Sequence, residues 1–315
     1  MGRPGTGLAV VTGGAGFIGS HLVEALLARG RPVRVVDSLV TGHRSNLDHL
    51  AGRFEWVEGD LGSFDVARRA MDGAEHVFHQ AAIPSVPRSV RDPIESHAAG
   101  PTATLHVLEA ARLAGARRVV FAASSSAYGD TDELPKHEAM MPRPLSPYAA
   151  GKLAGEHYVR AYARTMGLDG VSLRYFNIFG PRQDPSSPYS GVISVFARRM
   201  ARGERPTIYG DGTQTRDFTH VDNVVAANLR AVDAPGPLRG EAYNVGVGGR
   251  VSLLDLVAAL NRIHGTAIEP EFLPARAGDV RDSQASLGRV AEALGYRPVV
   301  DFEEGLRRTV AAGGG

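Results

Sequence analysis

A tyrosine and a lysine stand four residues apart in the segment SPYAAGK, residues 146–152. The amphipathic pattern of Pro147–Thr165 predicts a helix, so Tyr148 and Lys152 share one of its faces. An ammonium nearby favours the phenolate, and the pair could take a proton from a substrate hydroxyl as hydride leaves. Moving the pKa of tyrosine from ~10 toward ~7 requires roughly 4 kcal/mol. Such pairs are common on helices, so the pair alone does not define a site.

Ser124 ends an apolar run, RRVVFAAS, whose part Arg118–Ala122 predicts a strand buried on both faces. In a parallel sheet, ligands bind beyond the carboxyl ends of the strands. We therefore expect Ser124 near the same ligand, where its hydroxyl could hydrogen-bond the reacting oxygen.

A glycine-rich turn follows the first predicted strand in LAVVTGGAGFIGSH, residues 8–21. Gly14, Gly16 and Gly19 satisfy G-x-G-x-x-G, with Gly13 beside them. This pattern lets a pyrophosphate approach the backbone at a helix N-terminus. Asp37 ends the next strand, where a carboxylate can bind a ribose and repel a 2′-phosphate, which favours NAD over NADP.

Asp60 and Leu61 follow the third predicted strand. They could contact an adenine, or Asp60 could simply cap the next helix.

Apolar runs alternate with helical patterns in the first half of the chain, which predicts an α/β fold with a doubly wound parallel sheet of Rossmann type. The predicted strands are Leu8–Thr12, Val33–Asp37, Phe54–Val57, His76–His79, Arg118–Ala122 and Val171–Arg174. The predicted helices between them include His21–Arg29, Ile94–Ala114 and Pro147–Thr165.

The pattern changes after Asn177, where NIFGPRQDPSSPYSG predicts a long loop. A helix near Val192–Arg202, a return to the sheet and a helical part from Ser252 follow. We expect a cofactor domain of residues 1–176 that also receives about 214–249, and a smaller interwoven substrate lobe of 177–213 and 250–315.

Composition narrows the classes of protein. The 35 basic and 34 acidic residues nearly balance, so charge gives no case for nucleic acid or an anionic membrane. With no cysteine and no histidine pattern typical of metal ligands, no metal is expected. No apolar run reaches membrane-spanning length, and the start has no apolar stretch typical of a signal peptide, so a cytoplasmic enzyme is expected.

The chain resembles the extended short-chain dehydrogenase/reductase family over nearly its whole length, and most closely its UDP-glucose and UDP-N-acetylglucosamine 4-epimerases. The motifs that carry the resemblance stand in family order: TGGAGFIGSHL, HQAA (His79–Ala82), SSSAYGD (Ser124–Asp130), SPYAAGK, LRYFNIFGPRQ (Leu173–Gln183), GDGTQTRDF (Gly210–Phe218) and YNVG (Tyr243–Gly246).

The resemblance implies tightly held NAD, a nucleoside-diphosphate sugar and a catalytic set of Ser124, Tyr148 and Lys152. The residues implied for NAD are Gly13, Gly16, Phe17, Ile18, Gly19, Asp37, Asp60, Leu61, Ala81, Tyr148 and Lys152. Those implied for the substrate are Ser125, Ser126, Asn177, Val192, Tyr209, Arg216, Arg276 and Ser283. Two arginines suit a pyrophosphate, although Arg216 beside Asp217 could be a surface ion pair.

The serine cluster bears on the reaction. Sugar 4,6-dehydratases of the family carry Asp and Glu where this chain has Ser125 and Ser126, and the related decarboxylases keep the Glu. Without these carboxyl groups, 4-epimerisation is favoured, because it needs no acid beyond the tyrosine.

The sequence narrows the choice of substrate less than it narrows the choice of reaction. Ser283 matches a position where a bulky tyrosine narrows the pocket of strict UDP-glucose epimerases, so an N-acetyl group is accommodated. UDP-glucuronate 4-epimerases often have Thr at Asn177 and Arg at Asp184, which weakens that alternative. Also open are a dehydratase or 4-ketoreductase acting on another nucleotide sugar and, less favoured, a non-catalytic NAD sensor.

Two further expectations concern helices. Gly100 stands where the family often has Asn, and Pro101 predicts a start or kink within Ile94–Ala114. The family usually dimerises through helices that match Ile94–Ala114 and Pro147–Thr165, so a homodimer is expected.

Overall fold

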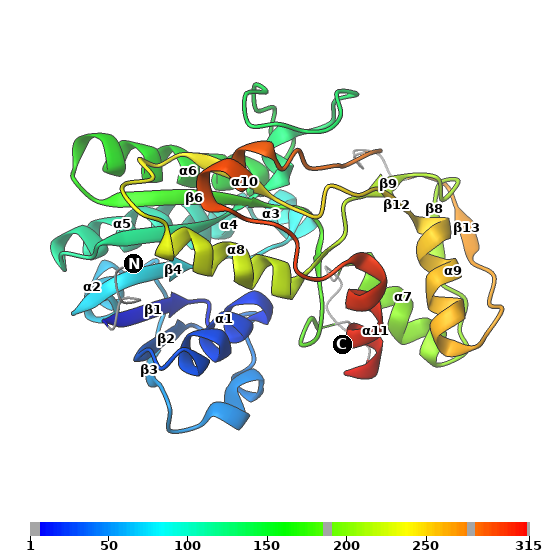
Figure 1. Ribbon diagram of the computed structural model, residues 1–315, viewed down its shortest axis with the longest axis horizontal. Coiled ribbons are helices and arrows are strands. Elements are labelled where there is room, and N and C mark those ends of the chain that lie inside the picture. Colours follow the sequence, from blue (N-terminus) through cyan, green and yellow to red (C-terminus); the bar gives the residue numbers. More distant parts are fainter. Residues whose placement is uncertain (1–6, 185–190, 276–280, 314–315) are drawn as a thin grey trace.

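A computed structural model of the chain describes residues 7–184, 191–275 and 281–313. Its centre is a seven-stranded sheet in the order β11-β6-β5-β4-β1-β2-β3, with every neighbouring pair parallel (Figure 1). The strands are β1 (Leu8–Thr12), β2 (Val33–Asp37), β3 (Glu55–Glu58), β4 (Ala74–His79), β5 (Arg118–Ser124), β6 (Asp169–Tyr175) and β11 (Ala242–Val245). The expected Rossmann-type sheet is confirmed.

Helices cover both faces of the sheet, as the buried strands require. One face packs on α1 (Phe17–Ala28), α8 (Val221–Asp233) and α10 (Gly288–Leu294). The other packs on α2 (Phe64–Met71), α5 (Ala103–Leu113) and α6 (Pro147–Thr165). Two short helices, α3 (Val86–Arg91) and α4 (Pro93–His97), contact α6.

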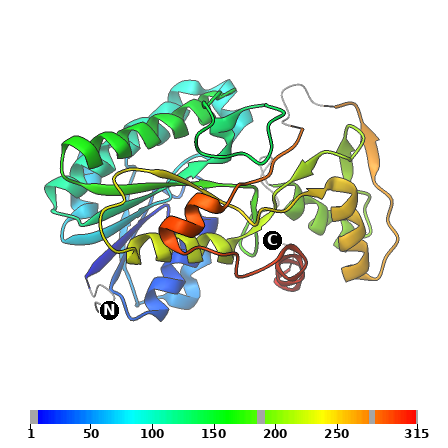
Figure 2. The same cartoon turned by 45° about the horizontal axis from the view of Figure 1, so that its top comes forward.

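The smaller lobe has its own apolar core, formed by α7, α9 and α11 (Figure 2). Its elements are α7 (Val192–Ala201), β8 (Thr207–Tyr209), α9 (Leu253–His264), β13 (Glu271–Leu273) and α11 (Phe302–Ala311). Two-stranded pairs join it to the sheet: β7 (Ile178–Phe179) with β10 (Thr219–His220), and β9 (Thr215–Arg216) with β12 (Val251–Ser252). Among the described residues, no helix is long and apolar enough to cross a membrane.

Four sequence expectations differ from the structure. The third strand starts at Glu55, one residue after the predicted Phe54. Helix α1 begins at Phe17, before the predicted His21, because the glycine turn leads directly into it. The stretch Ile94–Ala114 is not one helix: a π-helical turn at Ala98–Thr102 separates α4 from α5. Pro101 lies in this turn, which is wider than an α-turn, and proline lacks the N–H that an α-helix needs. The apolar pattern also does not predict β11, because AYNV is short and holds a polar residue.

His79 ends β4 and ties three elements together. Its Nδ1 lies 2.8 Å from the Thr12 hydroxyl, and its Nε2 lies 3.0 Å from the Thr104 hydroxyl. The ring is buried, and burial lowers its pKa to about 3, with Lys152 acting in the same direction. These contacts give His79 a packing role between β1, β4 and α5.

Because the folded-state pKa of His79 is depressed, the neutral ring stabilises the fold most above the unfolded pKa of about 6.5. Stability should then fall as the pH drops from 7 toward 4, by up to about 1.4 kcal/mol per pH unit from this group. The free energy of unfolding can be measured by urea unfolding of the native protein and of His79→Gln over this pH range. The variant should be less stable at pH 7 but show a flatter pH dependence, and equal slopes would contradict the assignment.

Candidate active site

The glycine turn leaves no room for side chains where β1 passes into α1. A Cβ at Gly13, whose φ is +64°, would lie 2.8 Å from the backbone of Ala81. A Cβ at Gly19 would lie 2.0 Å from the carbonyl oxygen of Gly13. The helix N-cap is Gly16, and no side chain caps it. Phe17 and Ile18 form the first turn, whose backbone N–H groups are available to an anion.

Asp37 holds this turn from the end of β2. Its Oδ2 accepts the Ala15 N–H at 2.9 Å, and its Oδ1 accepts the Leu39 N–H at 2.8 Å. Burial raises the pKa of Asp37, while these backbone hydrogen bonds act in the opposite direction. A carboxylate can accept further hydrogen bonds, so these contacts leave it able to bind a ribose hydroxyl. The turn and Asp37 together fit NAD.

Asp60 and Leu61 lie beyond β3. The exposed Asp60 accepts the Gly62 N–H at 2.8 Å through Oδ1, and the N-cap of α2 is Ser63. Asp60 therefore forms a turn before the helix rather than its cap. Leu61 is buried against the sheet, and Ala81 lies beside Gly13, its N–H bonded to the Thr12 hydroxyl at 3.2 Å.

Ser124, Ser125 and Ser126 form a tight turn at the carboxyl end of β5, and all three are half-buried. The Ser124 Oγ accepts the Ser126 N–H at 3.2 Å and its hydroxyl at 2.8 Å. A side-chain hydrogen bond joins Ser124 to Tyr148. The structure thus brings the expected serine and tyrosine together.

The pKa of Tyr148 differs from the sequence expectation. Burial raises it above its usual value, and the hydrogen bond with Ser124 only partly opposes this. The Lys152 ammonium instead donates to the carbonyl oxygen of Ala122 at 2.8 Å and lies over the Phe121 ring. The protein's own groups therefore keep the tyrosine protonated, and the expected lowering must come from bound ligands.

Lys152 is buried, and burial lowers its pKa to about 8, although the carboxylate of Glu156 acts to raise it. A small hollow opens beside it, between the loop after β4, the π-helical turn and α6. Its lining residues are Ala82, Ile83, Ser96, Gly100, Pro101, Tyr148, Gly151 and Lys152. The hollow borders the tyrosine–lysine face.

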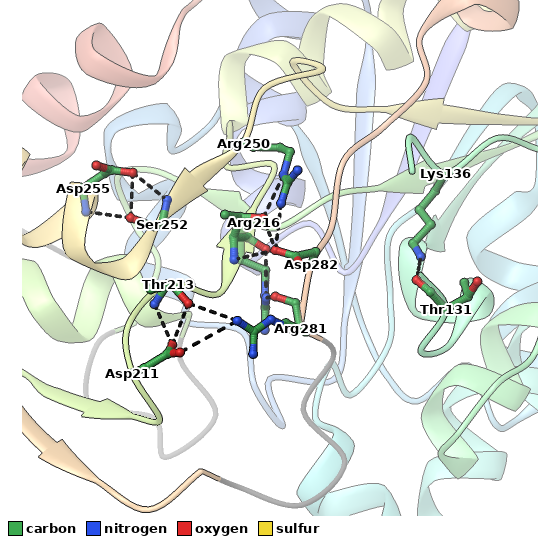
Figure 3. Close-up of polar contacts among 11 residues, drawn as sticks. Thr131, Lys136, Asp211, Thr213, Arg216, Arg250, Ser252, Asp255, Arg281 and Asp282 are labelled. Carbon is green, nitrogen blue, oxygen red and sulfur yellow. Dashed lines mark hydrogen bonds and ion pairs between the residues drawn. The ribbon is translucent and has the colours of Figure 1, made fainter. Parts of the chain in front are cut away.

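Arginines gather around Asp282 where the lobe meets the sheet domain (Figure 3). The Asp282 carboxylate accepts the Thr215 N–H and hydroxyl and an Arg250 N–H at 3.1 Å. Arg216 donates to the carbonyl oxygens of Thr215 and Arg281, at 2.9 and 2.8 Å. Arg281 lies 3.8 Å from Asp211. Positive charge is thus held beside the loop that carries Ser283.

Ser283 and Asn177 meet across this boundary. Ser283 is buried, and its hydroxyl lies 3.5 Å from the Asn177 Oδ1. The exposed Asn177 has a φ of +35°. The half-buried Val192 begins α7 and Tyr209 ends β8, while Arg276 lies outside the described residues.

Sequence reasoning missed Asp217, which is fully buried. Its carboxylate accepts backbone N–H groups from Val247, Gly248 and Ala285 at 2.9–3.0 Å. It therefore anchors two loops of the site. A short acidic residue between Arg216 and the aromatic Phe218 gives no periodic signal of burial.

The comparisons with known proteins agree with this geometry. The family model described as NAD dependent epimerase/dehydratase family matches residues 9–246. A UDP-glucose 4-epimerase of Mycolicibacterium smegmatis is 41% identical over 305 residues, which is 96% of each chain.

Similar solved structures differ in the sugar that their names print. A UDP-N-acetylglucosamine 4-epimerase from Methanobrevibacter ruminantium is 36% identical, with a TM-score of 0.92 and 97% of both chains covered. A UDP-glucuronic acid 4-epimerase from Bacillus cereus with NAD is 31% identical, with a TM-score of 0.89 and 97% and 98% covered. With the glycine turn and Asp37 in place, the chain belongs to the NAD-dependent epimerase/dehydratase family.

Proposed function

We propose that this protein interconverts UDP-hexoses at C4, either UDP-glucose with UDP-galactose or UDP-N-acetylglucosamine with UDP-N-acetylgalactosamine, through a transient 4-keto sugar. One observation carries the proposal: Tyr148 of α6 is hydrogen-bonded to Ser124 at the end of β5, in a serine turn where Ser125 and Ser126 supply no carboxyl group. The resemblance implies that the dehydratases and decarboxylases of the family use an acid at these positions for elimination and decarboxylation.

In this proposal Tyr148 takes the proton of the 4-hydroxyl, and Ser124 orients the same oxygen. When bound, NAD would supply a hydride acceptor and donor for C4 and a positive ring charge that favours the phenolate. The residues that would hold it are Gly13, Gly16, Phe17, Ile18, Gly19, Asp37, Asp60, Leu61, Ala81, Tyr148 and Lys152.

We assign the substrate to the boundary of the lobe. Arg216 and Arg276 would bind the diphosphate, since guanidinium groups match its oxygens. The other residues proposed to contact substrate are Ser125, Ser126, Asn177, Val192, Tyr209 and Ser283. The 4-keto sugar rotates in the site, so that the hydride returns to the opposite face of C4. Tyr148 returns the proton to the oxygen, and the configuration of the 4-hydroxyl is inverted.

The test is to incubate the purified protein separately with UDP-N-acetylglucosamine, UDP-glucose and UDP-glucuronate, without added cofactor. Each substrate that is used should give its galacto partner on chromatography. Tyr148→Phe should slow the reaction by ~10²-fold or more, and Tyr158→Phe, on the exposed side of the same helix, should not. If none of the three converts even after NAD is supplied, the proposal fails, and other nucleotide sugars and ketoreduction come next.

Ser283 gives a prediction about specificity. Ser283→Tyr fills the space beside Asn177, so it should lower kcat/KM for UDP-N-acetylglucosamine at least about 10-fold more than for UDP-glucose. Ser283→Ala keeps the space and should preserve the native ratio. An equal loss for both sugars in the tyrosine variant would show that Ser283 does not face the C2 substituent.

We also propose a homodimer formed through α3–α6. Three exposed apolar side chains support it: Val90 is 63%, Ile94 79% and Leu113 54% exposed. Light scattering at micromolar concentration should give twice the 33.4 kDa chain mass. Ile94→Glu should lower that mass toward one chain, whereas a native protein at monomer mass would refute the dimer.

A further inference from the structure

A buried ion pair lies one helical turn beyond Lys152 on α6. The Glu156 carboxylate accepts Nε of Arg174 at 2.9 Å and Nη2 at 2.7 Å. Glu156 is 6% and Arg174 5% exposed. Tyr148, Lys152 and Glu156 stand at successive steps of four residues, so they follow one side of the helix.

Arg174 connects this helix to the serine turn. It lies on β6, paired in register with Ala123, the residue before Ser124. The guanidinium carbon lies 4.7 Å from the ring centre of Tyr128, which ends the serine turn. The Tyr128 hydroxyl in turn donates to Asn244 at 2.6 Å. One guanidinium thus touches both segments that carry the Ser124–Tyr148–Lys152 set.

Stability alone does not account for such a pair. A buried ion pair is often no more stabilising than well-packed apolar residues, because both charges lose their hydration. Here the carboxylate stands one helical turn from a buried ammonium, whose pKa burial lowers and Glu156 raises. Because Arg174 is bonded to the same carboxylate, its positive charge offsets part of the negative charge of Glu156. The pair is therefore placed to set how readily Lys152 loses its proton.

Few other titratable groups face Lys152. Tyr148 lies on its own helix, and the neutral His79 faces it from β4. Among the described residues of the elements packed on α6, six charged side chains pair with one another. These pairs are Arg88–Glu95 on α3 and α4, Glu109–Arg112 on α5 and Arg118–Asp169 between β5 and β6.

We propose that Glu156 and Arg174 are positioning residues of the site: Glu156 holds Lys152 in its ammonium form, and Arg174 limits that effect while fixing the serine turn against α6. The catalytic consequence rests on the proposed epimerase function. The electrostatic part concerns the chain alone and can be measured without turnover.

The sequence makes that measurement clean, because Lys136 and Lys152 are its only lysines. Lysine labelled with ¹³C at Cε gives two side-chain signals in the protein without substrate, and Lys152→Met assigns them. Titrations of Glu156→Gln, Arg174→Gln and the double variant then report the pKa of Lys152. Lys136 lies in a different segment and serves as the internal control.

Glu156→Gln should lower the pKa of Lys152 by about one pH unit, and Arg174→Gln should raise it by a similar amount. The double variant should lie between them, and Lys136 should not move. If Arg174→Gln does not fold, Arg174→Lys keeps the charge and should leave the Lys152 pKa near its native value; its third lysine signal is told apart by adding Lys152→Met. Shifts of the same sign, no shift, or an equal shift at Lys136 would overturn the proposal.

Turnover provides the second readout. In Glu156→Gln, the alkaline limb of the kcat/KM profile should move to lower pH together with the pKa of Lys152. A loss of rate with an unmoved limb would indicate a merely structural pair and contradict the proposal. A native protein without epimerase activity would refute the proposed function and leave the titration result intact.

Discussion

The structure of this site depends on keeping one ammonium group buried. Moving a lysine charge out of water is costly unless hydrogen bonds and opposite charge replace its hydration. The Lys152 ammonium is stabilised by the carbonyl oxygen of Ala122, the face of the Phe121 ring and the carboxylate of Glu156. The first two partners belong to β5, so they require α6 to lie directly on that strand. Gly155 permits this approach, since a Cβ there would lie 2.5 Å from the Phe121 ring.

The remainder of the site follows from where α6 and the strand ends are held. Tyr148 lies one turn before Lys152 and reaches the serine turn at the end of β5. Opposite it, the lobe is joined to the sheet domain by carboxylates that bind backbone N–H groups. Asp217 holds residues 247, 248 and 285, and Asp282 holds Thr215. Ser283 lies in the segment between these two anchors.

Local patterns predicted the fold well, because most of its strands are continuous apolar runs that end in turn residues. The limits of β1, β2 and α6 were predicted to the residue. The family, the sheet and NAD are confirmed. The π-helical turn at Pro101 was predicted only as a start or kink, since periodicity cannot distinguish a kink from a wider turn.

Contacts between residues far apart in the chain could not be predicted from the sequence. The partners of Asp217 come from two loops, 30 and 68 residues away, and Arg174 stands in a strand where its burial depends on Glu156, 18 residues away. The expected lowering of the Tyr148 pKa was wrong for the protein's own groups, because the lysine four residues away bonds a strand carbonyl instead. The glycine, tyrosine and lysine motifs located the site, and tertiary packing decides its electrostatics.

The central claim is that the hydrogen taken from C4 of the sugar returns to C4. It can be tested with a UDP-hexose that the protein uses, labelled with deuterium at C4 and converted in ordinary water. The account predicts that mass spectrometry and NMR find the deuterium still at C4 of the galacto product, with no solvent hydrogen at C3 or C5. Loss of the label, or hydrogen from solvent at those carbons, would contradict epimerisation through a 4-keto sugar.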